Sequence, residues 1–199
     1  RGAGNLLGEE QSGQIKEVGV ELYQTMLEDA VASLREDGSG EEELDQWSPQ
    51  INIGTSVLIP ESYVPDLDVR LDLYRRLSSV KQRDEIDGFA AELIDRFGQL
   101  PEEVEHLLDI VGIKVLCRSS GVDKVDAGPK GVTLSFRKDE FVNPAGLVEY
   151  ITQSPEIKLR PDHKLVVRNH WPTPERRLRG VNTLLEILAQ IAEEAGEAA

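Results

Sequence analysis

The sequence is poor in the residues that disulfide-rich and membrane-bound architectures need. Its 199 residues include one cysteine, Cys117, which excludes an intrachain disulfide and favours a reducing, cytoplasmic location. No segment approaches the run of about 20 apolar residues that a membrane helix requires. Hydrophobic residues make up 39% of the chain, as in a globular domain rather than a disordered or collagen-like one. The chain opens at Arg1 rather than at methionine, which indicates a piece of a longer protein.

Motifs for catalysis and for cofactor binding are also missing. The glycines near Arg1 do not have the spacing of a dinucleotide loop, and there is no phosphate-binding loop or G-x-S-x-G nucleophile motif. The histidines His106, His163 and His170 are scattered, and none stands at a metal-ligand spacing from Cys117. Cys117 falls at the end of a helical pattern, which is typical of a buried structural thiol. The sequence therefore predicts no catalytic, metal or cofactor site in this chain.

The formal net charge is −15, with an isoelectric point near 4.6. A surface this acidic repels phosphate, so the chain as a whole is not expected to wrap duplex DNA. Residues 157–179 are the exception, because they contain seven basic residues against two acidic ones, with Trp171 among them. This stretch is either a patch for nucleic acid or an acidic partner, or a set of ordinary exposed side chains, and we favour the second interpretation. The basic residues are Lys158, Arg160, Lys164, Arg168, Arg176, Arg177 and Arg179.

The chain is expected to contain two structured parts. Residues 1–14 are rich in glycine, and a helix follows in which Leu22, Met26, Ala30 and Leu34 recur at four-residue spacing. Two glycines and an acidic run then predict a linker over residues 37–47. The parts on either side are residues 1–36 and a larger domain over residues 48–199.

The larger domain mixes both hydrophobic periodicities. Alternating residues predict strands over 51–57, 122–125, 132–136, 157–159 and 165–167. Helical spacing and capping residues predict helices after Asp66, over 84–98, from Pro101 to Gly121, from Asn143 to Tyr150, and from Pro174 onward. Because strands and helices do not alternate regularly, we expect an α+β fold with mainly antiparallel strands, preceded by the glycine-rich motif and its helix.

The predicted helix over 84–98 has an apolar stripe and an acidic back. Glu92 and Asp95 lie one turn apart on the side away from the stripe, with Glu85 nearby. For a single helix, a solvated face is the ordinary interpretation of such a pattern. The stripe itself consists of Ile86, Phe89, Ala90, Leu93, Ile94 and Phe97.

Several sequence blocks resemble a known family. R-G-A-G-N-L-L-G-E-E-Q-S-G, from Arg1 to Gly13, is similar to the motif shared by bacterial transcription-repair coupling factors and RecG translocases. The blocks I-P-E-S-Y-V-P-D, R-L-D-L-Y-R-R-L and E-L-I-D-R-F-G-Q-L-P resemble the coupling factors alone, as does Q-I-K-E-V-G-V-E-L-Y-Q-T-M-L-E-D-A-V. The resemblance extends over essentially the whole chain and is strongest up to about residue 101.

This resemblance implies a part of an ATP-driven translocase of double-stranded DNA. Proteins of the family remove RNA polymerase stalled at a lesion and recruit excision repair through UvrA. Their ATP and Mg²⁺ bind in motor domains, so no cofactor and no enzymatic activity are expected in this chain. Residues 1–36 would be the tail of the second motor domain, and residues 48–199 the C-terminal regulatory domain. The residues of the translocation motif would be Arg1, Gly4, Gly8, Gln11 and Gly13.

The resemblance also implies an autoinhibitory contact. The C-terminal domain of the family packs against a UvrB-like module of the same protein and masks its UvrA-binding surface. Acidic residues that form salt bridges with arginines of that module correspond to Glu92 and Asp95. The alternative function is an accessory nucleic-acid-binding module that uses the basic stretch 157–179.

Overall fold

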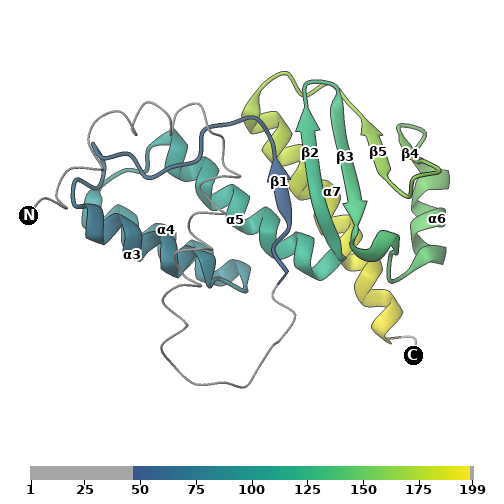
Figure 1. The fold of residues 1–199 in the computed structure, drawn as a ribbon, viewed down its shortest axis with the longest axis horizontal. Coiled ribbons are helices and arrows are strands. Elements are labelled where there is room, and N and C mark those ends of the chain that lie inside the picture. The colour runs from purple at the N-terminus through teal and green to yellow at the C-terminus, as the bar shows by residue number, and fades with distance from the viewer. Residues whose placement is uncertain (1–46, 198–199) are drawn as a thin grey trace, which may run out of the picture. The chain divides into compact units, whose positions relative to one another are not determined.

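The structure is a computed structural model that describes residues 47–197 (Figure 1). The chain divides between Glu42 and Glu43 into two units, and the described residues all belong to the second. The helix predicted near the start and nearly all of the predicted linker lie outside the described residues. So do the translocation-motif residues Arg1, Gly4, Gly8, Gln11 and Gly13. The proposed segment boundaries therefore stay predictions.

The described residues form an α+β fold around a five-stranded sheet with the order β1-β2-β3-β5-β4. All neighbouring strands pair antiparallel except β1 and β2, which are parallel. The strands are β1 (Gln50–Asn52), β2 (Val122–Gly128), β3 (Gly131–Phe136), β4 (Ile157–Leu159) and β5 (Leu165–Arg168). The helices are α3 (Leu67–Ser78), α4 (Arg83–Phe97), α5 (Glu102–Ser120), α6 (Pro144–Gln153) and α7 (Pro174–Glu197). The predicted fold class is confirmed, and the sheet is mixed rather than wholly antiparallel.

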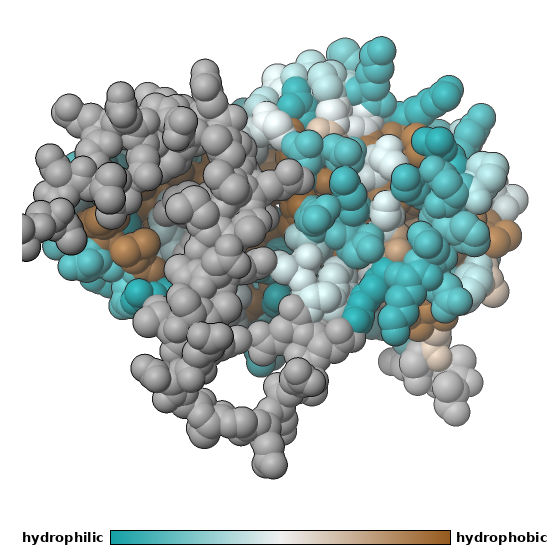
Figure 2. Space-filling view, in the orientation of Figure 1, coloured by the Kyte–Doolittle hydropathy of each residue, from teal (hydrophilic) through white to brown (hydrophobic). Residues whose placement is uncertain are grey.

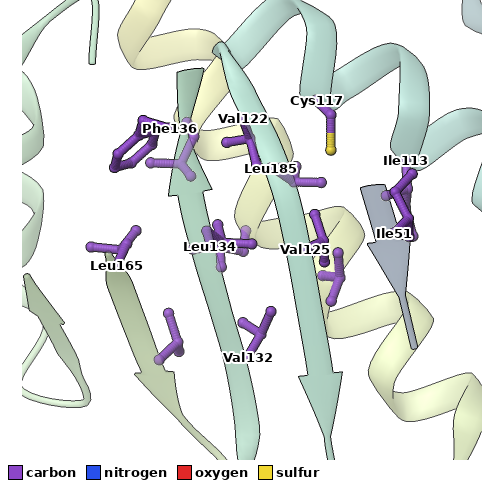
Figure 3. Close-up of a cluster of buried hydrophobic side chains, with 14 of the residues drawn as sticks. Ile51, Ile113, Cys117, Val122, Val125, Val132, Leu134, Phe136, Leu165 and Leu185 are labelled. Atoms are coloured by element: carbon purple, nitrogen blue, oxygen red, sulfur yellow. The ribbon is translucent and has the colours of Figure 1, made fainter. Parts of the chain in front are cut away.

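The two faces of the sheet have different environments. Helices α5 and α7 cover the face turned away from the viewer in Figure 1. Figure 3 shows Cys117 of α5 and Leu185 of α7 beside the strand residues Val125 and Leu134, and all four are fully buried. On the opposite face Lys124 and Asp126 are exposed and Ser135 is half-buried, and the region over these strands is largely hydrophilic in Figure 2. The sheet therefore packs its core on one side only, as antiparallel sheets commonly do.

Strand β1 is shorter than the alternating pattern predicted. Gly54 has a φ of +68°, a left-handed conformation that glycine adopts without strain and that turns the chain out of the sheet. The Arg177 guanidinium donates from Nη1 to the carbonyl oxygens of Ile53 and Gly54, at 3.1 and 3.4 Å. The predicted strand over residues 51–57 was therefore wrong after Asn52, because periodicity does not reveal a positive φ.

A second group of buried side chains lies outside the sheet core. It comes from α3, α4 and the first half of α5, and we call it the helical core. Helix α5 contacts both α4 and α7, and it supplies Ile113 and Cys117 to the sheet core. The helical core includes Leu73, Tyr74, Leu77, Ile86, Phe89, Leu93, Val104, Leu108 and Val111.

Candidate functional site

Helix α4 carries the two acidic residues that the resemblance singles out. Its start is fixed by a capping box in which the backbone N–H of Gln82 donates to Glu85 Oε1 at 3.1 Å. Its end is set by Gly98, whose φ is +90°. Between these caps Phe89 and Leu93 are buried in the helical core. Glu92 and Asp95 consequently lie on the side of α4 that is turned away from the core.

Glu92 is held by arginines from two helices. Arg76 of α3 donates from Nη1 to Glu92 Oε1 at 2.8 Å, and Arg96 of α4 donates to the same oxygen at 2.7 Å. The Arg76 guanidinium also lies 5.0 Å from the centroid of the Phe89 ring. Hydrogen bonds from Arg76 and then Arg96 lower the pKa of Glu92 to about 2. Glu92 therefore joins α3 to α4, and its charge is compensated within the domain.

Asp95 is in a different situation. Its side chain is exposed, and no residue between 47 and 197 forms a hydrogen bond or ion pair with it. An exposed carboxylate without a partner keeps its full capacity to accept hydrogen bonds from a basic surface. Of the two predicted contact residues, Asp95 is thus the one that presents an uncompensated charge.

Ile94, beside Asp95, is 50% exposed although the sequence placed it in the apolar stripe. At about 100° per residue Ile94 lies at the edge of that stripe, close to the exposed residues Asp87 and Ala91. Gly88 lies on the same side, and a Cβ there would meet no atom within 4 Å. Sequence reasoning missed this cluster, which only the angular position of Ile94 could have suggested. We call Asp87, Gly88, Ala91, Ile94 and Asp95 the α4 surface.

The basic stretch 157–179 does not form one continuous patch. Arg160 and Lys164 both pair with Asp162 in the turn between β4 and β5, at 3.3 and 3.5 Å. Arg177 is engaged with backbone, since it donates from Nε to the carbonyl oxygen of Trp171 at 3.1 Å and from Nη2 to that of Pro172 at 3.0 Å. Three of the seven basic side chains therefore serve the fold or a local turn.

Arg176 and Arg179 line an open groove of about 460 Å³ beside α7. Tyr150 and His170 also line it, and so does the acidic Glu156. The groove offers two cationic side chains to an anionic ligand, but its wall is not uniformly basic. Local pairing or backbone contacts account for Arg160, Lys164 and Arg177, and only Arg176 and Arg179 of the seven line the groove.

Cys117 is fully buried in the sheet core, and burial raises the pKa of its thiol well above the ordinary value. A thiol that stays protonated is a poor nucleophile and a poor metal ligand, so Cys117 has a structural role, as predicted. None of the helices between residues 47 and 197 is long and apolar enough to span a membrane.

Comparison with known domains defines the class. The family model of the TRCF domain matches residues 53–147, from the residue after β1 into α6. A crystal structure of the C-terminal domain of a transcription-repair coupling factor superposes with a TM-score of 0.61. The superposition covers 74% of this chain and 96% of that one, at 19% sequence identity, and it shows a shared fold. The described domain is thus a TRCF-type α+β domain.

Sequence relatives identify the family. The transcription-repair-coupling factor of Rickettsia conorii is 46% identical over 166 residues, which cover 83% of this chain. That of Escherichia coli is 36% identical over 157 residues, or 78% of this chain. The aligned residues make up 15% and 14% of these two relatives, so the chain spans a small part of their length. The chain belongs to the transcription-repair coupling factor family.

Proposed function

We propose that the described domain is a regulatory contact domain whose α4 surface binds an arginine-bearing surface of a UvrB-like module in the same protein. In the bound state the domain masks the surface of that module that recruits UvrA. The observation that carries this proposal is the exposed, uncompensated Asp95 beside the half-exposed Ile94. An exposed carboxylate beside a half-exposed apolar side chain can form an ion pair and a small apolar contact, and both are weak enough to release.

The paired state of Glu92 refines the proposal. Its carboxylate already binds Arg76 and Arg96, so an arginine of the module would have to share it rather than find it free. Asp95 has no such competitor among residues 47–197. We therefore assign the direct contact mainly to Asp95, and to Glu92 a supporting role through the packing of α3 on α4.

The energies involved suit a switch. An exposed ion pair contributes about 0.2–1 kcal/mol. A closed state favoured by about 2–3 kcal/mol is open about 1–3% of the time, because about 1.4 kcal/mol corresponds to a factor of ten. Loss of the Asp95 contact would then raise the open fraction about 1.4- to fivefold, and charge reversal would raise it further.

The test is the variant Asp95→Arg in a complete coupling factor that carries this chain. We expect tighter UvrA binding and a higher DNA-stimulated ATPase rate in the absence of RNA polymerase. Glu149→Arg is the matched control, because Glu149 is an exposed acidic residue on α6 and the charge change is the same. UvrA binding no tighter than in the Glu149→Arg protein would contradict the proposal. The double variant Glu92→Arg/Asp95→Arg should have a larger effect, and its melting must be checked because it also breaks the pairs with Arg76 and Arg96.

We further propose that the complete protein is an ATP-dependent translocase of double-stranded DNA that acts on stalled RNA polymerase, and that Arg1 and Gln11 couple ATP hydrolysis to movement. The family and the motif from Arg1 to Gly13 support this role. Arg1→Ala or Gln11→Ala should leave nucleotide binding nearly intact and abolish displacement of a triplex strand. Displacement at the wild-type rate would exclude the coupling role.

Binding of nucleic acid by the basic stretch remains the second candidate, favoured only by the groove that Arg176 and Arg179 line. If it is correct, the chain binds duplex DNA with a steep dependence on salt, and Arg176→Glu/Arg179→Glu abolishes that binding. If the contact domain is correct, the chain binds duplex DNA weakly, and this double variant leaves UvrA binding unchanged.

A further inference from the structure

Three side chains of the kinds that bind metal ions meet where α5 and α7 begin. His106 Nε2 lies 3.9 Å from Glu102 Oε1 and 4.0 Å from Glu175 Oε1. One nitrogen or oxygen atom from each of the three residues lies within 4.8 Å of the other two. Neither the α4 surface nor the basic groove includes any of them.

The imidazole of His106 is already held in place. The residue is 7% exposed, and its Nδ1 lies 3.0 Å from the hydroxyl oxygen of Thr55. A histidine that binds a metal usually donates its other ring N–H to an oxygen, which fixes the orientation of the ring. When Nδ1 donates to Thr55, the lone pair of Nε2 is directed to the two carboxylates. No residue between 47 and 197 forms a hydrogen bond with Nε2.

The two carboxylates reach the histidine from different helices. Glu102 and His106 lie one turn apart on α5, at the i, i+4 spacing that places two side chains on the same face. Glu175 lies in the first turn of α7. The Glu102 and Glu175 side chains are 71% and 54% exposed, so both can adjust their rotamers around the fixed imidazole.

The spacing is slightly wider than in an occupied site. Ligand atoms about 2.0–2.1 Å from a tetrahedral zinc ion are separated from one another by roughly 3.3–3.4 Å. The distances of 3.9 and 4.0 Å would therefore shorten by roughly 0.6 Å, which a change of rotamer in two exposed glutamates can supply.

We propose that Glu102, His106 and Glu175 bind a single Zn²⁺ ion, with Thr55 as the residue that orients His106 and with water completing the coordination. Two carboxylates balance the charge of the ion, and one imidazole nitrogen favours zinc over Mg²⁺, which prefers six oxygen ligands. The ion would tie the first turn of α5 to the first turn of α7. This site was missed in the sequence because Glu175 lies far along the chain from the other two residues.

The test is a calorimetric titration of Zn²⁺ into the chain without an affinity tag, with a parallel titration of Mg²⁺. We expect saturable binding of one Zn²⁺ per chain, a higher melting temperature with Zn²⁺, and no binding of Mg²⁺ at the same concentrations. Thr55→Val should weaken Zn²⁺ binding about 10- to 100-fold, as loss of an orienting partner typically does. Glu102→Gln, Glu175→Gln and His106→Ala should each weaken it at least as much.

The controls separate this site from adventitious binding. Glu105→Gln removes an exposed carboxylate from the same helix, and His170→Gln removes an exposed histidine, so both should bind Zn²⁺ as the wild type does. If His106→Ala fails to fold, the variants of the exposed Glu102 and Glu175 decide the question. The proposal is overturned if the wild type binds no Zn²⁺ saturably, if Glu102→Gln and Glu175→Gln bind as the wild type does, or if His170→Gln abolishes binding.

Discussion

The helical core and the sheet core of this domain use their charged residues in different ways. Around α3 and α4, Glu92 and two arginines bind one another across the helix pair, and Asp95 is left facing solvent. Around the sheet, Arg177 instead donates hydrogen bonds to the backbone carbonyl oxygens of Ile53 and Gly54, in the bend that follows β1. Arg177 beside the sheet therefore fixes the chain path, whereas Asp95 on α4 has no partner among residues 47–197 and stays available for a contact. This difference is why we place the contact with a partner on α4.

Helix α5 connects the two regions. It supplies Val104 and Leu108 to the helical core, and Ile113 and Cys117 to the sheet core. Because α5 packs in both cores, a cavity made in one core affects the other core only if α5 itself shifts. We therefore expect the helical core and the sheet core to unfold in one global transition. Local opening, as seen by hydrogen exchange, should still differ between them.

The largest expected effect is in the sheet. A Cβ at Gly131 would lie 1.9 Å from the carbonyl oxygen of Val167, at a φ of +123°. Gly131→Ala should therefore force β3 away from β5 and cost about 4 kcal/mol or more of the free energy of unfolding, or prevent folding. Gly128→Ala, at the other end of the same turn, meets no atom within 4 Å and is the control. Urea unfolding of both variants measures the difference, and equal stabilities would contradict the close approach of β3 to β5 at Gly131.

The next effect separates the helical core from the sheet core. Leu93 is fully buried on α4, so Leu93→Ala should cost about 3 kcal/mol. Hydrogen exchange should accelerate more in α3 and α4 than in β2 and β3. Leu134→Ala removes the same side chain from the sheet core and should accelerate exchange in β2 and β3. If Leu93→Ala accelerates exchange equally in both regions, the helical core is not a separate unit.

Many elements of this domain could be predicted from the sequence, because their signals are local. The carboxylate of Asp66 accepts from the backbone N–H of Val69 at 3.0 Å and begins α3, and Gly121 ends α5 with a φ of +67°, both as the capping patterns predicted. The parallel pairing of β1 with β2 could not be predicted, since it joins residues more than 70 positions apart. The clustering of Glu175 with His106 could not be predicted either, because these two residues also lie far apart along the chain.

The candidate site could be predicted only in part. The family resemblance indicated Glu92 and Asp95 as contact residues. It did not indicate that Arg76 of α3 would bind the Glu92 carboxylate. That pair depends on how α3 packs on α4, which no spacing within one helix reveals.

A smaller effect tests the pairing of Glu92. Its pKa in the folded state is lowered to about 2, below the ordinary value near 4.5. The pairing therefore stabilises the fold fully above about pH 4.5, and this stabilisation is lost as the pH falls towards 2. Because the side chain is partly exposed, we expect the wild type to lose only about 1 kcal/mol more than Glu92→Gln between pH 5 and 2. Asp95→Asn should lose as much as the wild type, and acid unfolding curves that coincide for wild type and Glu92→Gln would contradict the pairing.

The most direct measurement of the central claim is binding between this chain and the separately produced UvrB-like module, followed by calorimetry at low and high salt. We expect Asp95→Arg to weaken binding by about fivefold or more and Glu92→Gln to weaken it only slightly. The Glu149→Arg control should bind as the wild type does, and the wild-type affinity should fall as salt screens the exposed charge. Wild-type affinity in the Asp95→Arg chain, with normal melting, would show that the acidic side of α4 is only a solvated helix face.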